Sequence, residues 1–321
     1  MFHRLAAAFL CAVLATPASA NDSVATIGAG GLILVQADTI TMEKEDLYVS
    51  PAEIRVNYVF RNNDSADHTY LVAFPMPQID PRDYLESDIS VPERDKDNFM
   101  NFAIRVGGAS VEPKLEMRAL TGGIDVTGMI AGLGIPLNPL AGKTHDALAA
   151  VPRQKLADLI AMGAVRVSED GVAPSWSLKS TYYWLQNFPA NAALDVSHTY
   201  TPAVGGSFFY DGALTDGVLA KTYCIDGGTA KAIRKKLAAA SKDNPLLMQR
   251  SIEYILTTGA NWQGSIGDFR LVVDKADTSA IVSFCMDGVK KIAPAQFEVR
   301  KKDFYPTEEL KVLLLESIPQ Q

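Results

Sequence analysis

The feature that most constrains the fold is the alternation of apolar and polar residues that dominates the first half of the chain. Within residues 52–61, Ile54, Val56, Tyr58 and Phe60 fall on one parity, while Glu53, Arg55, Asn57 and Arg61 fall on the other. Such a period of two is typical of a strand with one buried face. A polar cluster at residues 62–65 supplies turn chemistry, and residues 70–74 alternate again. The pattern predicts a β-hairpin over residues 52–74.

Further segments of the same kind extend this prediction. Residues 102–106 and 111–117 flank a Gly-Gly pair, which suits a tight hairpin turn. Residues 175–188 are extended and aromatic, and residues 194–200 alternate. We therefore predict a mainly β protein with an antiparallel, Ig-like β-sandwich built from residues 21–120 and 173–206.

Two regions depart from this rhythm. Residues 121–172 contain many glycines and a helical pattern between Pro152 and Gly163, which predicts a mostly helical insertion. Residues 207–321 are predicted to form a smaller β-rich α+β part with one helix. Within that part we expect a strand near residues 218–224 and a helix at residues 229–242, with Thr229 as its N-cap.

The first twenty residues have the three zones of a cleavable export signal. Arg4 lies before an apolar run over residues 5–16, and a small-residue site ends at Ala20. The run is too short to span a bilayer, which takes about 20 apolar residues, and we predict no transmembrane helix after cleavage. Removing residues 1–20 takes the formal net charge from −7 to −8. An acidic chain argues against a nucleic-acid partner. We predict a periplasmic or secreted bacterial protein that begins at Asn21.

Cys224 and Cys285 are the two cysteines that remain after this cleavage. An even number of cysteines in an oxidising compartment is compatible with one disulfide. Both cysteines follow apolar strand candidates and precede an Asp-Gly turn. We predict that they form a bridge, with two buried free thiols as the alternative.

Few residues carry recognisable catalytic chemistry. The sequence contains no nucleophile elbow, phosphate-binding loop or zinc-protease motif, and no two histidines have metal-ligand spacing. We expect neither a metal nor a cofactor. The more suggestive set is the aromatic row of residues 176–188 together with a histidine on an apolar strand face. These candidate ligand-binding residues, for which core packing is the alternative, are Trp176, Tyr182, Trp184, Phe188 and His198.

Several short segments, taken in order, resemble a bacterial family catalogued as domain of unknown function 4424. They are Asn21-Asp22-Ser23, Gly30-Gly31-Leu32, residues 45–51, Ala73-Phe74-Pro75-Met76-Pro77, Phe188-Pro189-Ala190, His198-Thr199-Tyr200, Trp262, residues 266–271, Phe284-Cys285 and Asp287-Gly288. The resemblance spans nearly the whole chain after residue 20. It implies an exported protein and transfers no catalytic residue.

These observations favour a non-enzymatic binding or interaction module of the bacterial envelope. Its partner would be an envelope protein or an apolar or glycan ligand. The alternative is a hydrolase of unfamiliar type that acts on an envelope or glycan substrate through a pair of carboxylates about 5–9 Å apart.

Overall fold

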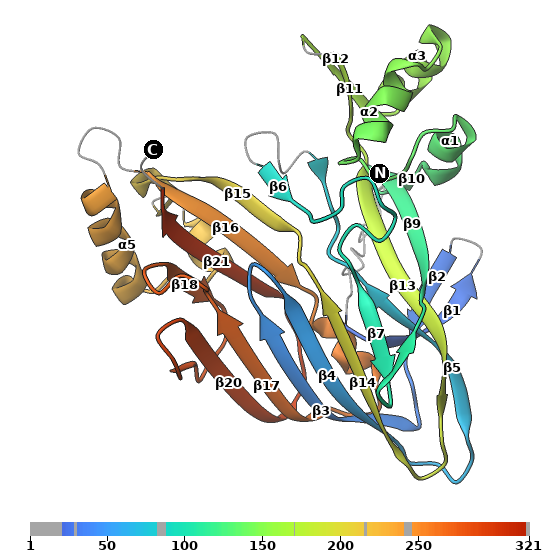
Figure 1. Cartoon of the computed structure of the whole chain (residues 1–321), viewed down its shortest axis with the longest axis vertical. Coiled ribbons are helices and arrows are strands. Elements are labelled where there is room, and N and C mark those ends of the chain that lie inside the picture. The colour runs from blue at the N-terminus through green and yellow to red at the C-terminus, as the bar shows by residue number, and fades with distance from the viewer. Residues whose placement is uncertain are drawn as a thin grey trace, which may run out of the picture.

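The structure, a computed structural model, describes residues 21–28, 31–81, 88–169, 171–214, 217–240 and 246–318. The predicted signal peptide, residues 1–20, lies outside the described residues. The fold is mainly β, as predicted, and three sheets form its body (Figure 1). None of the helices in the described part of the chain is long and apolar enough to cross a membrane.

The largest sheet has eight strands and runs diagonally across the molecule (Figure 1). In spatial order these are β19 (Lys290–Lys291), β20 (Gln296–Phe304), β17 (Ile266–Asp274), β3 (Ile40–Val49), β4 (Ile54–Asn62), β14 (Ala193–Tyr200), β7 (Ala103–Val106) and β8 (Ala109–Val111). All neighbours are antiparallel except β3 and β17, which run parallel. The sheet is therefore mixed.

A six-stranded sheet faces the amino-terminal half of the large sheet. Its strands in order are β10 (Ile124–Asp125), β9 (Lys114–Thr121), β13 (Ser177–Phe188), β5 (His68–Pro75), β1 (Ser23–Gly28) and β2 (Gly31–Val35). The predicted alternation of residues 54–60 is confirmed, since its four apolar side chains are at most 1% exposed. They belong to the main core, which lies between the sheets.

The hairpin expected over residues 52–74 is wrong, because its two strands lie in different sheets. β4 pairs with β3 and β14, whereas β5 pairs with β1 and β13. Both apolar rows face one core from opposite sides, and alternation cannot distinguish facing strands from neighbouring ones. Asn62 holds the corner, since its side-chain amide donates to the backbone oxygens of Ala66 (2.8 Å) and Phe188 (2.9 Å).

A five-stranded sheet and two helices occupy the other end of the molecule. The strands in order are β18 (Ile281–Phe284), β21 (Leu310–Ser317), β16 (Leu247–Tyr254), β15 (Val204–Phe209) and β6 (Asp88–Ser90). Helix α5 (Gly227–Ala240) buries Ile233 and Leu237 in a small cluster with residues of this sheet. Short 3-10 helices occur at η2 (Asp211–Leu214) and η3 (Thr257–Asn261).

Two expectations for this region are wrong. The strand expected near residues 218–224 is helix α4 (Val218–Thr222), because a run of five residues is too short to reveal its period. The cap of α5 is Asp226 rather than Thr229: its Oδ1 accepts the Thr229 backbone N–H at 2.6 Å. Aspartate is as good a cap as threonine, and it lies one turn earlier.

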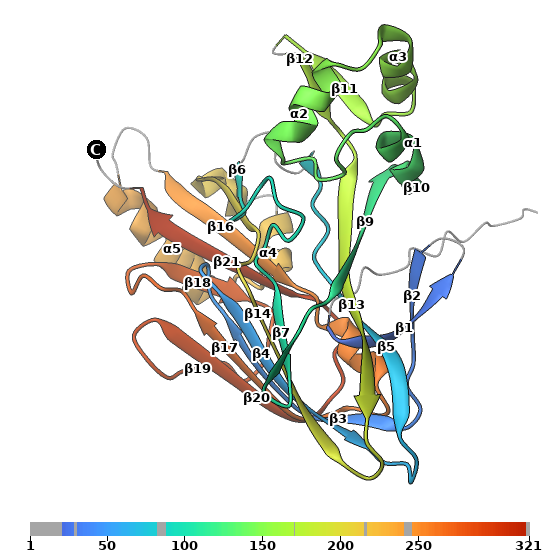
Figure 2. The same cartoon turned by 45° about the vertical axis from the view of Figure 1, so that its right-hand side comes forward.

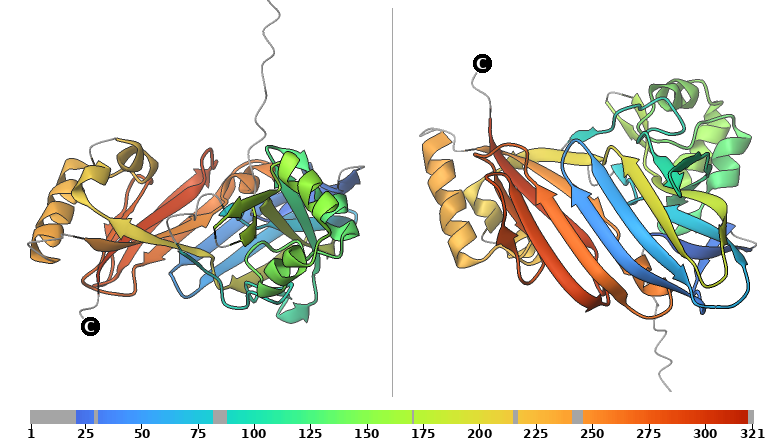
Figure 3. Two further views of the ribbon diagram at one scale, coloured as in Figure 1. Left: turned by 90° about the horizontal axis from the view of Figure 1, so that it is seen from above. Right: turned by 60° about the horizontal axis from the view of Figure 1, so that its bottom comes forward.

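Residues 121–172 stand above the ends of β9 and β13 (Figure 2). They hold α1 (Thr127–Gly132), α2 (Gly142–Ala149), α3 (Arg153–Ala161) and a hairpin of β11 (Val165–Ser168) and β12 (Gly171–Pro174). These elements have a small apolar cluster of their own, which includes Trp176. They lie at the opposite end of the molecule from α5 (Figure 3).

The C-terminal third shares its sheets with the rest of the chain. β17, β19 and β20 continue the large sheet beyond β3, and β6 from the N-terminal part joins the five-stranded sheet. The predicted boundary near residue 206 thus falls inside a shared core.

Candidate functional site

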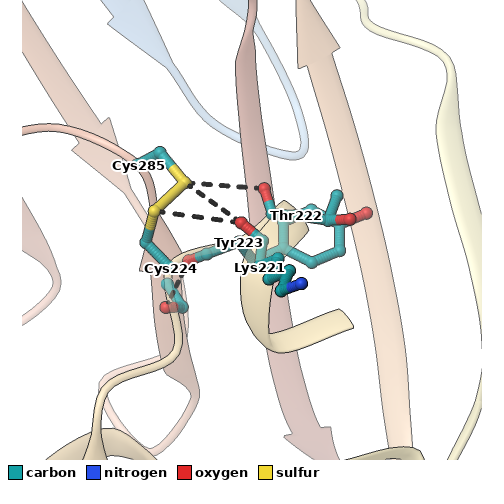
Figure 4. The surroundings of a disulfide bond; sticks show 6 residues. Lys221, Thr222, Tyr223, Cys224 and Cys285 are labelled. Carbon is teal, nitrogen blue, oxygen red and sulfur yellow. Dashed lines mark hydrogen bonds between the residues drawn. A yellow bond between two sulfur atoms is a disulfide. The ribbon is translucent and has the colours of Figure 1, made fainter. Parts of the chain in front are cut away.

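The predicted disulfide between Cys224 and Cys285 is confirmed. The bridge joins residues 61 apart in sequence, with Cα atoms 5.0 Å apart. Cys224 follows helix α4 in a left-handed conformation with a φ of 51°, and Cys285 directly follows β18. The two sulfur atoms lie 3.6 to 3.9 Å from carbonyl oxygens at the end of α4 (Figure 4). The bridge therefore ties the loop before α5 to the edge of the five-stranded sheet.

Two hollows of about 320 Å³ each flank this bridge, and Cys224, Met286 and Asp287 line both. The first hollow continues over apolar and polar side chains: Leu256, Phe304, Leu310, Lys301, Thr307, Glu308 and Glu309. The second continues over Asp226, Thr229, Val282, Ser283, Phe284, Val289 and Phe297. Their volume is at the lower end of the range for small-molecule sites, about 300–1,000 Å³.

Carboxylates dominate the charge of the first hollow. Glu309 is held in place, because it accepts hydrogen bonds from the backbone nitrogens of Leu256 (2.6 Å) and Thr257 (3.2 Å). Asp287 and Glu308 are exposed, and neither forms an ion pair within the described residues. The single cation of this hollow is Lys301. This excess of negative charge favours a ligand that presents a cationic or hydrogen-bond-donating group.

The second hollow contains an acidic residue, Asp226, whose carboxylate is already engaged in a helix cap. Asp226 caps α5, and the hydrogen bond from the Thr229 backbone lowers the pKa of its carboxyl group. The remaining wall is largely apolar, with Val282, Phe284 and Phe297. Together the hollows offer an apolar surface with acidic groups at its border, around a rigid covalent bridge.

The five residues proposed as a ligand surface are all buried, with exposed fractions of 5% or less. Four of them meet in the main core, where the Trp184 and His198 rings lie 5.5 Å apart and Tyr182 stacks on Phe102 at 4.2 Å. Trp176 packs instead in the cluster of the insertion, and its indole N–H donates to the Leu137 carbonyl at 2.8 Å. None of them lines the two hollows.

His198 belongs to a buried polar cluster that the sequence reasoning missed. Its Nε2 lies 3.0 Å from both carboxylate oxygens of Asp22, and both side chains are at most 1% exposed. Burial raises the pKa of Asp22, and the nearby His198 opposes that shift. The Trp262 indole donates to the Asp22 carbonyl at 2.6 Å. A pair so enclosed has no access to a substrate.

Glu45 is the other ionisable member of this cluster and is fully buried. Its carboxylate accepts hydrogen bonds from the Asn21 side chain (3.1 Å) and the Tyr254 hydroxyl (3.4 Å). Burial raises the pKa of Glu45 to about 8. A signal was available, because Glu45 shares the inward parity of Leu47 and Val49 on β3.

No cluster of three or more histidine, cysteine, aspartate or glutamate side chains able to hold a metal occurs within the described ranges.

Comparison with known proteins gives the family but no activity. A structure of a "putative nutrient binding protein" from Legionella pneumophila has 16% sequence identity and a TM-score of 0.47, and the match covers 92% of this chain and 70% of that one. No curated protein matches. The family model described as "Domain of unknown function (DUF4424)" matches residues 20–313, so this chain belongs to that family, as the ordered segments of its sequence predicted.

Proposed function

We propose that this protein is an extracytoplasmic binding module that takes a small ligand at the bridged end of the molecule. The observation that carries the proposal is the pair of 320 Å³ hollows that share Cys224, Met286 and Asp287. Two neighbouring hollows around one covalent bridge form a preorganised concave surface, and preorganisation lowers the entropic cost of binding.

The compartment is part of this proposal. A disulfide is typical of proteins outside the reducing cytoplasm, and the first twenty residues have the pattern of an export signal. Both features support a periplasmic or secreted protein, released by cleavage after Ala20.

The ligand we propose is a small molecule with an apolar body and an amine or quaternary ammonium group. Asp287 and Glu308 would hold the cation, while Leu256, Phe304 and Leu310 would cover the apolar part. Several carboxylates around one hollow create a negative potential that attracts such a cation, even though Asp287 and Glu308 are exposed.

The methyl group of Met286 provides the test, since it borders both hollows. The mature chain is labelled with [13C-methyl]methionine and titrated with putrescine, choline, glucose and acetate. We expect a saturable shift of the Met286 signal, assigned with Met286→Leu, for the two cations only. Asp287→Lys should abolish the shift, whereas Asp195→Lys, a matched change on an exposed position of β14, should leave it unchanged.

The same spectra show whether a ligand binds instead at the insertion, residues 121–172. Met129 and Met162 lie in and beside the helices of residues 121–172 and are 39% and 38% exposed. Shifts confined to these two signals would move the ligand to the insertion and refute the proposal. Shifts with glucose or acetate but not with the cations would refute the ligand class.

A hydrolase is the second candidate function, because Asp287, Glu308 and Glu309 line one hollow. Glycoside hydrolases use two carboxylates about 5–10 Å apart, one as acid and one as base or nucleophile. Incubation with peptidoglycan, followed by assay of new reducing ends, separates the two functions. Turnover that is lost in Glu308→Gln would favour the hydrolase over the binding module.

A further inference from the structure

Asn21, Asp22 and Ser23 are buried although they begin the described chain. Their exposed fractions are 0%, 1% and 0%. They lead into β1 beside η3, at a point where β3, β4 and β16 also contribute side chains. Polar residues are buried at a cost unless their groups find partners, so a polar segment in the core calls for a physical reason.

The surroundings of Asn21 are shaped to hold it. Its backbone nitrogen donates to the Thr258 hydroxyl, and its side-chain oxygen accepts a hydrogen bond from the Tyr58 hydroxyl. Gly259 lies against the same side chain, and a Cβ placed there would be 2.9 Å from Asn21 Nδ2. The neighbourhood thus leaves no room for a larger residue at position 259 and provides partners for the backbone nitrogen and both side-chain polar atoms of Asn21.

Glu45 has no cationic partner among the described residues of this pocket, and burial keeps its carboxyl group protonated up to a pH of about 8. Asp22 has His198 at 3.0 Å, but Glu45 forms no ion pair within the described residues. The groups that face Glu45 are Asn21, Tyr58, Tyr254 and the carboxyl group of Asp22, and none of them is a cation. Burial raises the pKa of both tyrosines well above 10, so they stay neutral. A buried carboxyl group without a cationic partner stays neutral through a raised pKa, and a cation placed beside it would allow it to ionise.

We propose that the missing positive charge is the α-ammonium group of Asn21, created when the signal peptide is removed, and that this mature amino terminus completes the core. The inference rests on the proposed export and cleavage after Ala20. Hydrolysis of the Ala20–Asn21 peptide bond by a signal peptidase consumes one water. It leaves a carboxylate on Ala20 and an ammonium group on Asn21 at neutral pH.

The exchange of an amide for an ammonium group changes what the pocket can bind. A peptide nitrogen has one hydrogen to donate, and in the structure it goes to Thr258. An ammonium group has three, so it keeps the Thr258 contact and can turn two more toward the carboxylates of Glu45 and Asp22. The side chain of Asn21 already reaches Glu45 at 3.1 Å, which places both of its nitrogens in this pocket.

The test compares two oxidised chains produced from a removable fusion. One begins at Asn21, and the other keeps Ser19 and Ala20. We expect the extended chain to melt about 3–6 °C lower, as for the loss of one buried interaction in a domain of this size. In the Glu45→Gln background the difference should shrink by at least half. The matched control is Glu43→Gln, a part-exposed residue of the same strand that pairs with Arg61; it should leave the difference intact.

The dependence of stability on pH provides a readout that simple steric disruption would not move. With a peptide nitrogen at Asn21, the pKa of Glu45 is about 8 in the folded chain against 4.5 in the unfolded chain. The folded state then binds the extra proton, so this stability is fully present below pH 4.5 and is lost as the pH rises through about 8. The extended chain should therefore lose more stability between pH 5 and pH 8 than the chain that begins at Asn21.

Chemical labelling decides whether the amino group is buried. In the folded chain that begins at Asn21, an acetylating reagent should modify lysines at least tenfold faster than the terminal amine, and the difference should disappear in urea. Equal reactivity in the folded state, or equal melting temperatures of the two chains, would overturn the inference. Amino-terminal sequencing of the exported protein tests the cleavage separately. A first residue other than Asn21 would refute the predicted cleavage site, but it would not refute the claim that the pocket can hold an ammonium group at Asn21.

Discussion

Removal of the Cys224–Cys285 bridge tests how much this disulfide contributes to the stability of the fold. The variant replaces both cysteines by serine, which avoids an unpaired thiol. The bridge closes a loop over 61 residues, for which the loop-closure model gives about 4 kcal/mol of stability through the entropy of the unfolded chain.

The expected change in melting temperature follows from the size of the chain. Unfolding entropy is about 2.1 cal/mol/K per residue, which amounts to about 0.6 kcal/mol/K for roughly 300 residues. A loss of about 4 kcal/mol should therefore lower the melting temperature by about 7 °C. A smaller loss is expected if α4 and α5 separate from the sheet before the rest unfolds.

Calorimetry with and without reductant provides both the measurement and its control. Reductant should lower the melting temperature of the native chain to that of the double-serine variant and leave the variant unchanged. A fall below about 2 °C in both cases would refute the entropic argument. Two free thiols per chain, counted on unfolded and unreduced protein, would refute the bridge itself.

Three further predictions concern stability elsewhere in the chain. His198→Gln should lower the free energy of unfolding, measured with urea, by about 3–5 kcal/mol, because it leaves a buried carboxylate unpaired. His68→Gln, which removes the histidine of a part-exposed pair, should lower it by less than about 1 kcal/mol. Asn62→Ala should lower the free energy of unfolding by about 1–3 kcal/mol, because two backbone carbonyls lose the amide that donates to them. The neighbouring Asn63 is exposed, and Asn63→Ala should lower it by less than about 0.5 kcal/mol. Amides of residues 121–172 should exchange with solvent faster than those of the eight-stranded sheet, and equal protection would contradict this.

The strands of the core were predictable because their burial pattern has a period of two. Residues 54–60 are the best example, with every second side chain inside. The disulfide was also predictable, from the number of cysteines and their place after apolar runs. Both inferences use local information that does not depend on which strands become neighbours.

The pairing of strands was not predictable in the same way. β4 and β5 follow each other along the chain with a polar turn between them, yet they cross from one sheet to the other. Asn62 caps this corner, and one of its partners, Phe188, is distant in sequence. Such contacts leave no periodic trace.

The candidate site could not be predicted from the sequence for a related reason. The aromatic row of β13 is the most conspicuous pattern in the chain, and the structure uses it to fill the core. The hollows instead collect single residues from β18, β20 and β21, from the loops beside them and from the segment around the start of α5. Met286 and Asp287 could be associated with the bridge from the sequence, but Lys301 and Glu308 could not.

The topology also explains how the amino terminus and the last third of the chain depend on each other. β3 lies between β4 and the parallel strand β17, and a parallel neighbour requires a long crossover. Here the crossover includes β5, β9, β10 and β13 of the six-stranded sheet and β6, β15 and β16 of the five-stranded one. Glu45 lies on β3, whereas Tyr254 lies on β16 and Thr258 in η3, so the pocket around Asn21 is complete only when these distant segments have met.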